Sequence, residues 1–447
     1  MPFLIIFLHF LFLSFIIYSL KKKYKDMPLI KWWYFAVFTK IIFGVFYGIL
    51  YIKVYGSGGD TFLYFQEVSV LVNLAYNDFE SFWKIFWYNE YNPYINISAA
   101  TWKQERVLVT IKFLSLLQTL TLNDYWIQGF YLSFVSAWAM WKLANTLVQI
   151  FPKTYFSSIL VFLAFPSIQL WSSGYTKESI TMFFLCFSLA YFLQIYFGII
   201  SFKKYFLKII FVWILTIIWL FLVKFYYLAA LLPTIFAFIL CDWILIKIQI
   251  KSYILKALLF VIVWFMVVLP TTQLHNTLKI NYFLLALSYN HNSTYIHSHP
   301  QDLIHYSIYP VQGFVSLEGK SVMSFLYNAP IAFFSACFRP FLWETYNQKL
   351  KILMALENTF FLISVIIGIF CLLKVKKNIE NKYFLLSISL IWYSIILLTI
   401  LAFASPNFGG LMRYRIAVYP FLLYFFLSWI EKYYREKYVL WNKNIDK

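Results

Sequence analysis

The sequence predicts an all-α polytopic integral membrane protein with about eleven transmembrane helices. The chain of 447 residues is 62% hydrophobic and only 12% charged, whereas a soluble chain carries about twice that charged fraction. Apolar runs of about 20 residues also recur along the whole length, as expected of helices that cross a bilayer. We therefore expect residues 1–447 to form a single transmembrane domain.

Basic residues in the short loops predict the direction of each crossing. Lys21, Lys22, Lys23 and Lys25 follow the first apolar run, so this loop is expected in the cytoplasm and the N-terminus outside. An odd number of crossings then places the C-terminus in the cytoplasm. The net charge of +19 lies mostly in such loops, where it meets lipid headgroups, and indicates no nucleic-acid partner. The predicted spans are 3–20, 32–55, 126–151, 155–171, 179–200, 209–227, 229–246, 257–270, 352–373 and 383–403, with an eleventh after Arg415 and an outer turn near Lys224.

Two longer, less apolar segments are expected at the outer face. Residues 56–104 begin with glycines and Asp60 and are rich in Trp and Tyr, which predicts one or two amphipathic helices at the level of the headgroups. Residues 271–350 form the second external segment. Two apolar stretches, 106–122 and 322–338, are short for a full crossing, and both interpretations, half-helix and extra span, stay open.

Four motifs bring charged residues to helix ends at the predicted outer face. A carboxylate can take a proton from an attacking hydroxyl, and arginine matches phosphate oxygens with its fixed fork of donors. The motifs therefore predict a polar reaction on an anionic, lipid-linked substrate, with Asp60 as the acid–base group. The expected substrate-binding residues are Tyr64, Lys177, Glu178, Arg339, Glu344, Arg413 and Arg415. The motifs are Gly58-Gly59-Asp60-Thr61 with Tyr64, Trp171-Ser172-Ser173-Gly174 with Lys177-Glu178, Phe338-Arg339-Pro340 with Trp343-Glu344, and Arg413-Tyr414-Arg415.

This layout resembles the GT-C superfamily of integral membrane glycosyltransferases, which use polyprenyl-phosphate sugars. The resemblance implies that Asp60, which matches the aspartate of their first external loop, is the catalytic base. It also implies an undecaprenyl-phosphate sugar donor and a glycan or lipid-linked acceptor at the outer face of the bacterial cytoplasmic membrane. The chain departs from the superfamily in its additional N-terminal helix and in Thr61, which follows Asp60 where many members have a second acidic residue.

Two other functions stay open. The motif from Pro166 to Glu178 is similar to one in EpsG or Wzy-type polymerases of surface-polysaccharide clusters, which would join oligosaccharides at the same face. A transporter or flippase would instead place charges inside the spans, and Lys40 and Asp242 are the candidates for that role.

No cofactor is predicted, and a divalent metal is left open. His297 and His299 could bind a metal, but no neighbouring carboxylate or cysteine completes a recognisable signature. The four cysteines are scattered in apolar sequence and form no CxxC pair. Aromatic residues near the predicted outer mouths could stack on sugars, and the candidates are Trp83, Trp87, Trp171 and Trp343.

Overall fold

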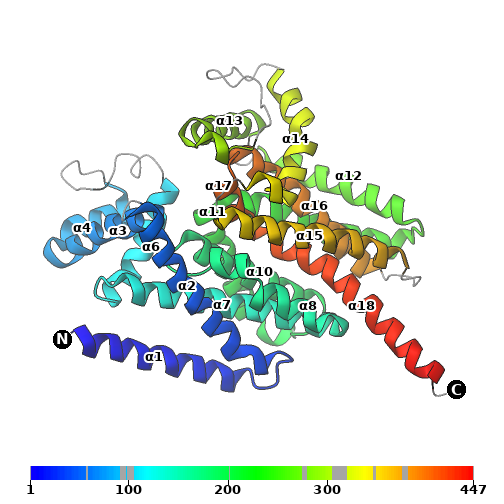
Figure 1. Cartoon of the computed structure of the whole chain (residues 1–447), viewed down its shortest axis with the longest axis horizontal. Helices are drawn as coiled ribbons and strands as arrows, with labels where there is room; N and C mark the ends of the chain where they lie inside the picture. The colour runs from blue at the N-terminus through cyan, green and yellow to red at the C-terminus, as the bar shows by residue number, and fades with distance from the viewer. Residues whose placement is uncertain are drawn as a thin grey trace. The chain divides into compact units, whose positions relative to one another are not determined.

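The computed structural model describes a helical chain, over residues 2–56, 59–90, 97, 105–200, 202–273, 279–304, 320–345, 349–374 and 381–445 (Figure 1). These ranges contain no β-strand, and one isolated bridge joins Leu303 to Asn407. Seven of the described helices are long and apolar enough to cross a membrane. The prediction of an all-α, multi-pass membrane protein is thus confirmed, while the number of eleven crossings is not.

The chain divides into two compact units, Met1–Phe225 and Tyr226–Lys447. The boundary falls inside one long helix, α11 (Phe202–Ile248). Each unit is described by itself below. The prediction of a single transmembrane domain over 1–447 stays a prediction.

Unit 1 is organised around α7, whose residues are mostly buried, including the polar Gln128, Ser133 and Asn145. It packs mainly against α10 and α2. Small residues along α7 allow neighbouring helices to approach closely, and Trp33 of α2 meets Trp141 of α7 edge to face at 4.9 Å. The helices of unit 1 are α1 (Pro2–Lys23), α2 (Trp33–Tyr55), α3 (Asp60–Asn77), α4 (Phe79–Tyr88), α6 (Glu105–Leu120), α7 (Tyr125–Ile150), α8 (Tyr155–Ile159), α9 (Pro166–Trp171), α10 (Lys177–Tyr196) and the first part of α11.

The segment predicted as one span at 155–171 is broken. A π-helical turn, Leu160–Ala164, follows α8, and α9 begins only at Pro166. Phe165 between them is extended, with φ −67° and ψ 120°, because a residue before proline avoids the helical region. Buried residues surround the break, which is the setting in which irregular backbone is tolerated at membrane depth.

The outer turn predicted near Lys224 is wrong. Residues 209–227 and 229–246 belong to the single helix α11, which has 47 residues. No glycine occurs in this stretch and Pro233 is its one proline, so no residue near Lys224 favours a turn. A helix of this length extends for about 70 Å, which is more than twice the hydrocarbon thickness of about 30 Å.

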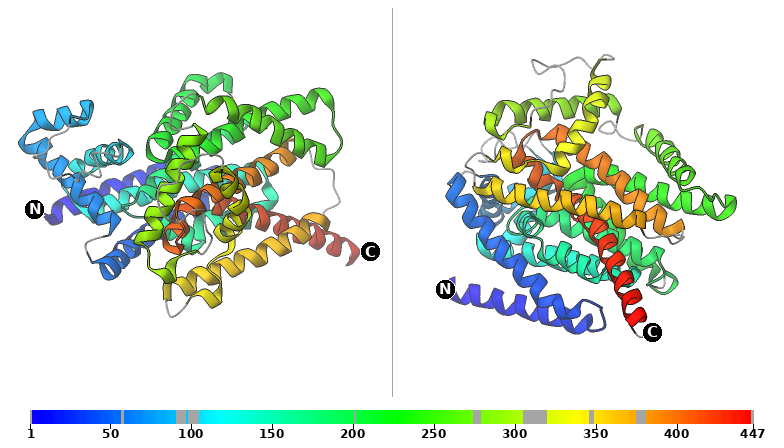
Figure 2. Two further views of the ribbon diagram at one scale, coloured as in Figure 1. Left: turned by 90° about the horizontal axis from the view of Figure 1, so that it is seen from above. Right: turned by 45° about the vertical axis from the view of Figure 1, so that its right-hand side comes forward.

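In unit 2, α15 packs mainly against α18, and α16 packs mainly against α14 and α13. Helix α16 also contacts α12 and α18, and α14 contacts α15. In the right-hand view of Figure 2, α15 (gold) and α18 (red) lie next to each other, and the C-terminal part of α18 extends beyond α15. Gly368 permits this approach, because a Cβ atom there would lie 2.9 Å from Cβ of Phe426. Besides the second part of α11, the helices are α12 (Tyr253–Thr271), α13 (Ile280–His297), α14 (Lys320–Phe338), α15 (Lys349–Lys374), α16 (Asn381–Ala404), α17 (Phe408–Tyr414) and α18 (Tyr419–Ile445).

Neither of the two short apolar stretches is among the seven candidate spans. The stretch 106–122 lies in α6, which has 16 residues, and 322–338 lies in α14, which has 19 residues and a proline, Pro330, inside it. Among the described residues, their apolar helical parts are Val107–Leu120 and Phe325–Phe338. The described part of the segment 56–104 contains the helices α3 and α4, and their location at the membrane surface stays a prediction.

Candidate functional site

The first predicted motif forms a tight connection between α2 and α3. Gly56 ends α2 with φ +62°, which a residue with a side chain adopts only with strain. Gly59 is the N-cap of α3, and Asp60 is its first residue. Residues 57–58 and the side chain of Asp60 lie outside the part of the chain that the structure describes.

The start of α3 is bound to the second motif, more than a hundred residues further along the chain. Thr61 donates a hydrogen bond from Oγ1 to the carbonyl oxygen of Tyr175, and the Tyr125 hydroxyl lies 3.0 Å from the same Oγ1. One turn later, the ring centroid of Tyr64 lies 4.1 Å from Nζ of Lys177. The structure therefore brings together Tyr64 and Lys177, and it fixes the helix turn that begins with Asp60 against the start of α10. Burial raises the pKa of the Tyr175 phenol in this junction well above its usual value.

The segment Ser172–Thr176 can reach this position because two glycines touch. Gly174 has φ +73°, and an added Cβ atom on Gly44 of α2 would lie 2.9 Å from its nitrogen. The same nitrogen donates to Oγ of Ser133 at 2.8 Å. Thr176 then caps α10 by accepting a hydrogen bond from the backbone nitrogen of Ser179 at 3.1 Å.

Lys40 holds the other end of this segment. Its side chain is buried in α2, and Nζ donates to the carbonyl oxygens of Ile168 and Ser172 and to the Ser172 hydroxyl. These oxygens belong to the last turn of α9 and the residue after it, where a cation is favoured because the final carbonyl groups lack helical partners. Sequence reasoning treated Lys40 only as a charge within a span and missed this contact.

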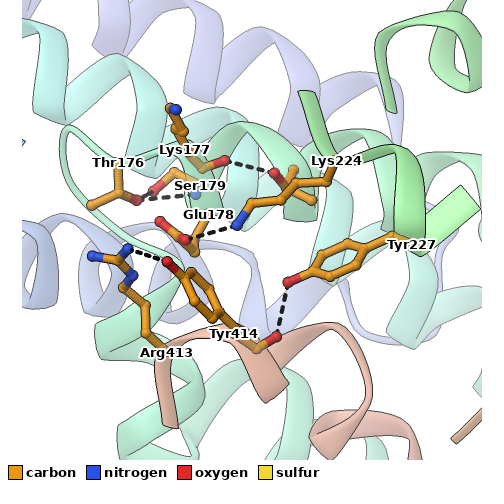
Figure 3. Close-up of polar contacts among 9 residues, drawn as sticks. Thr176, Lys177, Glu178, Ser179, Lys224, Tyr227, Arg413 and Tyr414 are labelled. Carbon is orange, nitrogen blue, oxygen red and sulfur yellow. Dashed lines mark hydrogen bonds and ion pairs between the residues drawn. The ribbon is translucent and has the colours of Figure 1, made fainter. Parts of the chain in front are cut away.

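Glu178 pairs with Lys224, the residue at which a turn was expected. Lys224 Nζ lies 3.3 Å from Glu178 Oε1, and both side chains are less than 10% exposed (Figure 3). A buried charge is stable only when it is paired. The pair links the first turn of α10 to the middle of α11 and explains how a lysine can lie within a long apolar helix.

In unit 2, Arg339 and Glu344 form an ion pair in the connection after α14. Arg339 Nε lies 2.8 Å from Glu344 Oε1, and Glu344 Oε2 also accepts from the backbone nitrogen of Phe341 at 2.8 Å. The guanidinium carbon lies 5.5 Å from the ring centroid of Phe408. The two residues that the sequence assigned to substrate binding are thus joined to each other, with Glu344 in a position to orient the arginine.

A second cation lies on Phe408, the first residue of α17. Lys351 Nζ is 5.4 Å from that ring centroid, forms an ion pair with Asp302 and donates to the carbonyl oxygen of Gln301 at 2.8 Å. Sequence reasoning missed Lys351, because it stands among other basic residues at the start of an apolar run and no local signal distinguishes it.

The two arginines of the fourth motif have different surroundings. Arg413 is half-buried; its NH2 group lies 2.9 Å from the Tyr414 hydroxyl, and the Tyr227 hydroxyl donates to the carbonyl oxygen of Tyr414 at 2.8 Å (Figure 3). Arg415 is fully buried, which lowers its pKa from the usual value. Its guanidinium donates to the carbonyl oxygens of Ala336 and Cys337 at the end of α14, at 3.2 and 3.4 Å.

Asn358 of α15 completes the surroundings of Arg415. Its Oδ1 accepts from the guanidinium, and its Nδ2 donates to the carbonyl oxygen of Pro340 at 3.1 Å. Arg415 thus binds carbonyl oxygens that precede Arg339 in the chain, and Asn358 binds the carbonyl oxygen of the residue that follows it. This geometry gives Arg415 a positioning role for the Arg339 turn.

The other predictions have mixed outcomes. Trp171 is buried and presents no surface for a sugar, whereas Trp83, Trp87 and Trp343 are exposed. Three polar or aromatic residues of the two predicted external segments, His305, Glu318 and Trp102, fall outside the described ranges. Within those ranges, no group of three or more His, Cys, Asp or Glu residues is placed to hold a metal ion. The prediction on metal use stays a prediction.

The eight predicted site residues fall into two sets. Comparison of the chain with protein-family models, with curated proteins and with solved structures found no match. Unit 1 holds Asp60, Tyr64, Lys177 and Glu178, and unit 2 holds Arg339, Glu344, Arg413 and Arg415.

Proposed function

We propose that this chain is a membrane glycosyltransferase. It moves a sugar from an undecaprenyl-phosphate donor to a surface-glycan or lipid-linked acceptor, at the outer face of the bacterial cytoplasmic membrane. The observation that supports this most is the junction of the first two motifs, in which Thr61 binds Tyr175 and Tyr64 lies on Lys177. Asp60 is the first residue of the helix turn that takes part in this junction, and a carboxylate can take a proton from an acceptor hydroxyl.

In the proposed reaction, Asp60 takes the proton from the acceptor hydroxyl. The hydroxyl oxygen attacks the anomeric carbon in line, the bond from that carbon to the phosphate oxygen breaks, and the configuration inverts. Arg339 and Arg413 bind the departing lipid phosphate, since fixed positive charge stabilises the negative charge that develops on it. Arg415 and Glu344 position Arg339, and Lys177 binds the donor or acceptor near Asp60.

Two alternatives remain and have distinct signatures. A polysaccharide polymerase would use the same groups on lipid pyrophosphate, and its loss would leave single repeats but no long chains. Loss of a transferase would instead remove one sugar from the glycan. A transporter or flippase is favoured by one observation, the buried charges of Lys40 and the Glu178–Lys224 pair within the helices of unit 1.

The test uses membranes of a strain in which the wild-type chain is replaced by variants at equal expression. Asp60→Asn and Asp60→Ala should each lower transfer from the lipid-phosphate sugar by about 10²- to 10⁴-fold, the usual contribution of a general base. Asp78→Asn is the matched control, because it removes an acid from the same segment while asparagine still caps α4. Full transfer by both Asp60 variants would refute the proposal.

A further inference from the structure

Helix α7 buries a lysine whose ammonium group binds no oxygen among the described residues. Lys142 is 5% exposed, and its Nζ lies 3.5 Å from the ring centroid of Tyr191 and 5.0 Å from that of Phe187, both on α10. No hydrogen bond or ion pair joins the Nζ atom of Lys142 to any residue that the structure describes. A cation–π contact contributes about 2 kcal/mol, whereas an ion removed from water costs several. The aromatic rings therefore offset only part of the cost of burying this charge.

The neighbours of Lys142 add donors and positive charge. Lys23, the last residue of α1, and Lys208, near the start of α11, lie close enough to repel it electrostatically, and both are exposed. One turn before Lys142 on α7, the indole nitrogen of Trp138 is buried and has no hydrogen-bond partner among the described residues, although the Tyr24 hydroxyl lies near it. The ring of Trp138 meets Phe187 edge to face at 5.0 Å.

We propose that Lys142, Trp138, Lys23 and Lys208 form a binding site for a phosphate group, here called the Lys142 site. Three ammonium groups and an indole N–H supply donors and positive charge, and a phosphate supplies the acceptor oxygens that Lys142 Nζ lacks among the described residues. The inference does not depend on the proposed glycosyltransferase activity, because none of these residues belongs to the predicted motifs.

The source of the phosphate that fits best is the headgroup of an anionic phospholipid. The basic end of α1 is expected at the cytoplasmic face, where anionic lipids gather. Lys142 lies eight residues before the end of α7, or about 12 Å along the helix axis, which is within one leaflet. Only 11% of the apolar window of α1 is buried within the chain, so its surface can accept acyl chains beside the headgroup.

The test measures the melting temperature of the purified full-length chain in detergent with added phosphatidylglycerol, phosphatidylcholine or inorganic phosphate. Phosphatidylglycerol should raise it and phosphatidylcholine should not. Lys142→Met keeps the length of the side chain and removes its charge. This variant should melt no lower than wild type without lipid and should need at least tenfold more phosphatidylglycerol for the same increase. Lys22→Met, which removes an exposed lysine next to Lys23, is the matched control and should respond as wild type does.

Each outcome decides the matter. An equal rise in melting temperature of wild type and Lys142→Met with phosphatidylglycerol would overturn the site. A rise that is weakened in Lys22→Met but not in Lys142→Met would overturn it as well. Inorganic phosphate acting as well as the lipid would support the phosphate site and overturn the lipid as its occupant. If Lys142→Met does not fold, Trp138→Phe serves instead, because it removes one donor and keeps the aromatic ring. It should weaken the response to phosphatidylglycerol several-fold, and an unchanged response would overturn the site.

Discussion

Replacing Gly44 by alanine should destabilise unit 1, although alanine is the better helix former. Helix α2 passes the segment between α9 and α10 at this residue. A Cβ atom would lie 2.5 Å from Oγ of Ser133 and 2.9 Å from the nitrogen of Gly174. The first of these atoms belongs to a short side chain and the second to backbone. Ser133 can rotate away, whereas Gly174 can move only with the segment that carries it.

The expected cost follows from two losses and one gain. Forcing an extra methyl group into a packed site costs about 1–3 kcal/mol. Rotation of Ser133 removes the acceptor for the buried nitrogen of Gly174, which is bound at 2.8 Å, and an unsatisfied buried donor costs about 1–3 kcal/mol. The helix gains about 0.5–1 kcal/mol from alanine. The net cost is about 3 kcal/mol, which lowers the melting temperature of a unit of this size by about 6–12 °C.

Gly129→Ala is the control for this experiment. It lies on α7, faces the same segment, and its added Cβ atom would lie 3.7 Å from the nitrogen of Tyr175, which is ordinary contact. It should leave the melting temperature of the detergent-solubilised protein unchanged or slightly raise it. If Gly44→Ala and Gly129→Ala melt alike, the close contact of Gly44 with Gly174 is not what holds the segment in place.

Three further predictions concern other parts of the chain. Asn358→Ala removes hydrogen bonds on both sides of the Arg339 turn, one of them to a buried guanidinium, and should lower stability by about 2–4 kcal/mol in a melting assay. A fluorophore on a cysteine that replaces the exposed Trp87 of α4 should be quenched by nitroxide lipids, whereas one on a cysteine that replaces Lys84 should be quenched by aqueous iodide. Equal quenching of the two labels by iodide would contradict binding of α4 at the membrane surface. Burial lowers the pKa of His291, so wild type should lose stability below about pH 6.5, while His291→Gln melts independently of pH there.

The sequence predicts helices well where apolar runs end in polar or basic residues. The ends of α2, α12, α15 and α16 lie within a few residues of the predicted bounds, because burial in lipid and exposure in loops both follow from composition. It fails where a charge occurs inside an apolar run. Lys224 was taken for a loop residue because a lone lysine in lipid is costly, and its partner Glu178 is 46 residues away in the chain.

The candidate site shows the same limit. Local features identify Gly174, Thr176 and Lys177 as a helix start, since a glycine with positive φ precedes a threonine N-cap. Nothing local predicts that Tyr175 receives a hydrogen bond from Thr61, because that contact depends on how closely α2 approaches the segment. Contacts between distant segments depend on the packing of the whole unit, which composition and local motifs do not predict.

The buried lysines of unit 1 show how one residue type is accommodated in three ways. Lys40 binds the carbonyl oxygens at the end of α9, and Lys224 binds the carboxylate of Glu178. In both, an oxygen offsets the loss of hydration, as burial of charge requires. Lys142 is as deeply buried, yet among the described residues only aromatic rings contact its ammonium group, and other lysines repel it. The same unit supplies an oxygen to Lys40, to Lys224 and also to the buried Lys112, whose Nζ donates to the carbonyl oxygen of Phe86 at 2.7 Å. A bound ligand is therefore the natural source of the oxygen that Lys142 lacks.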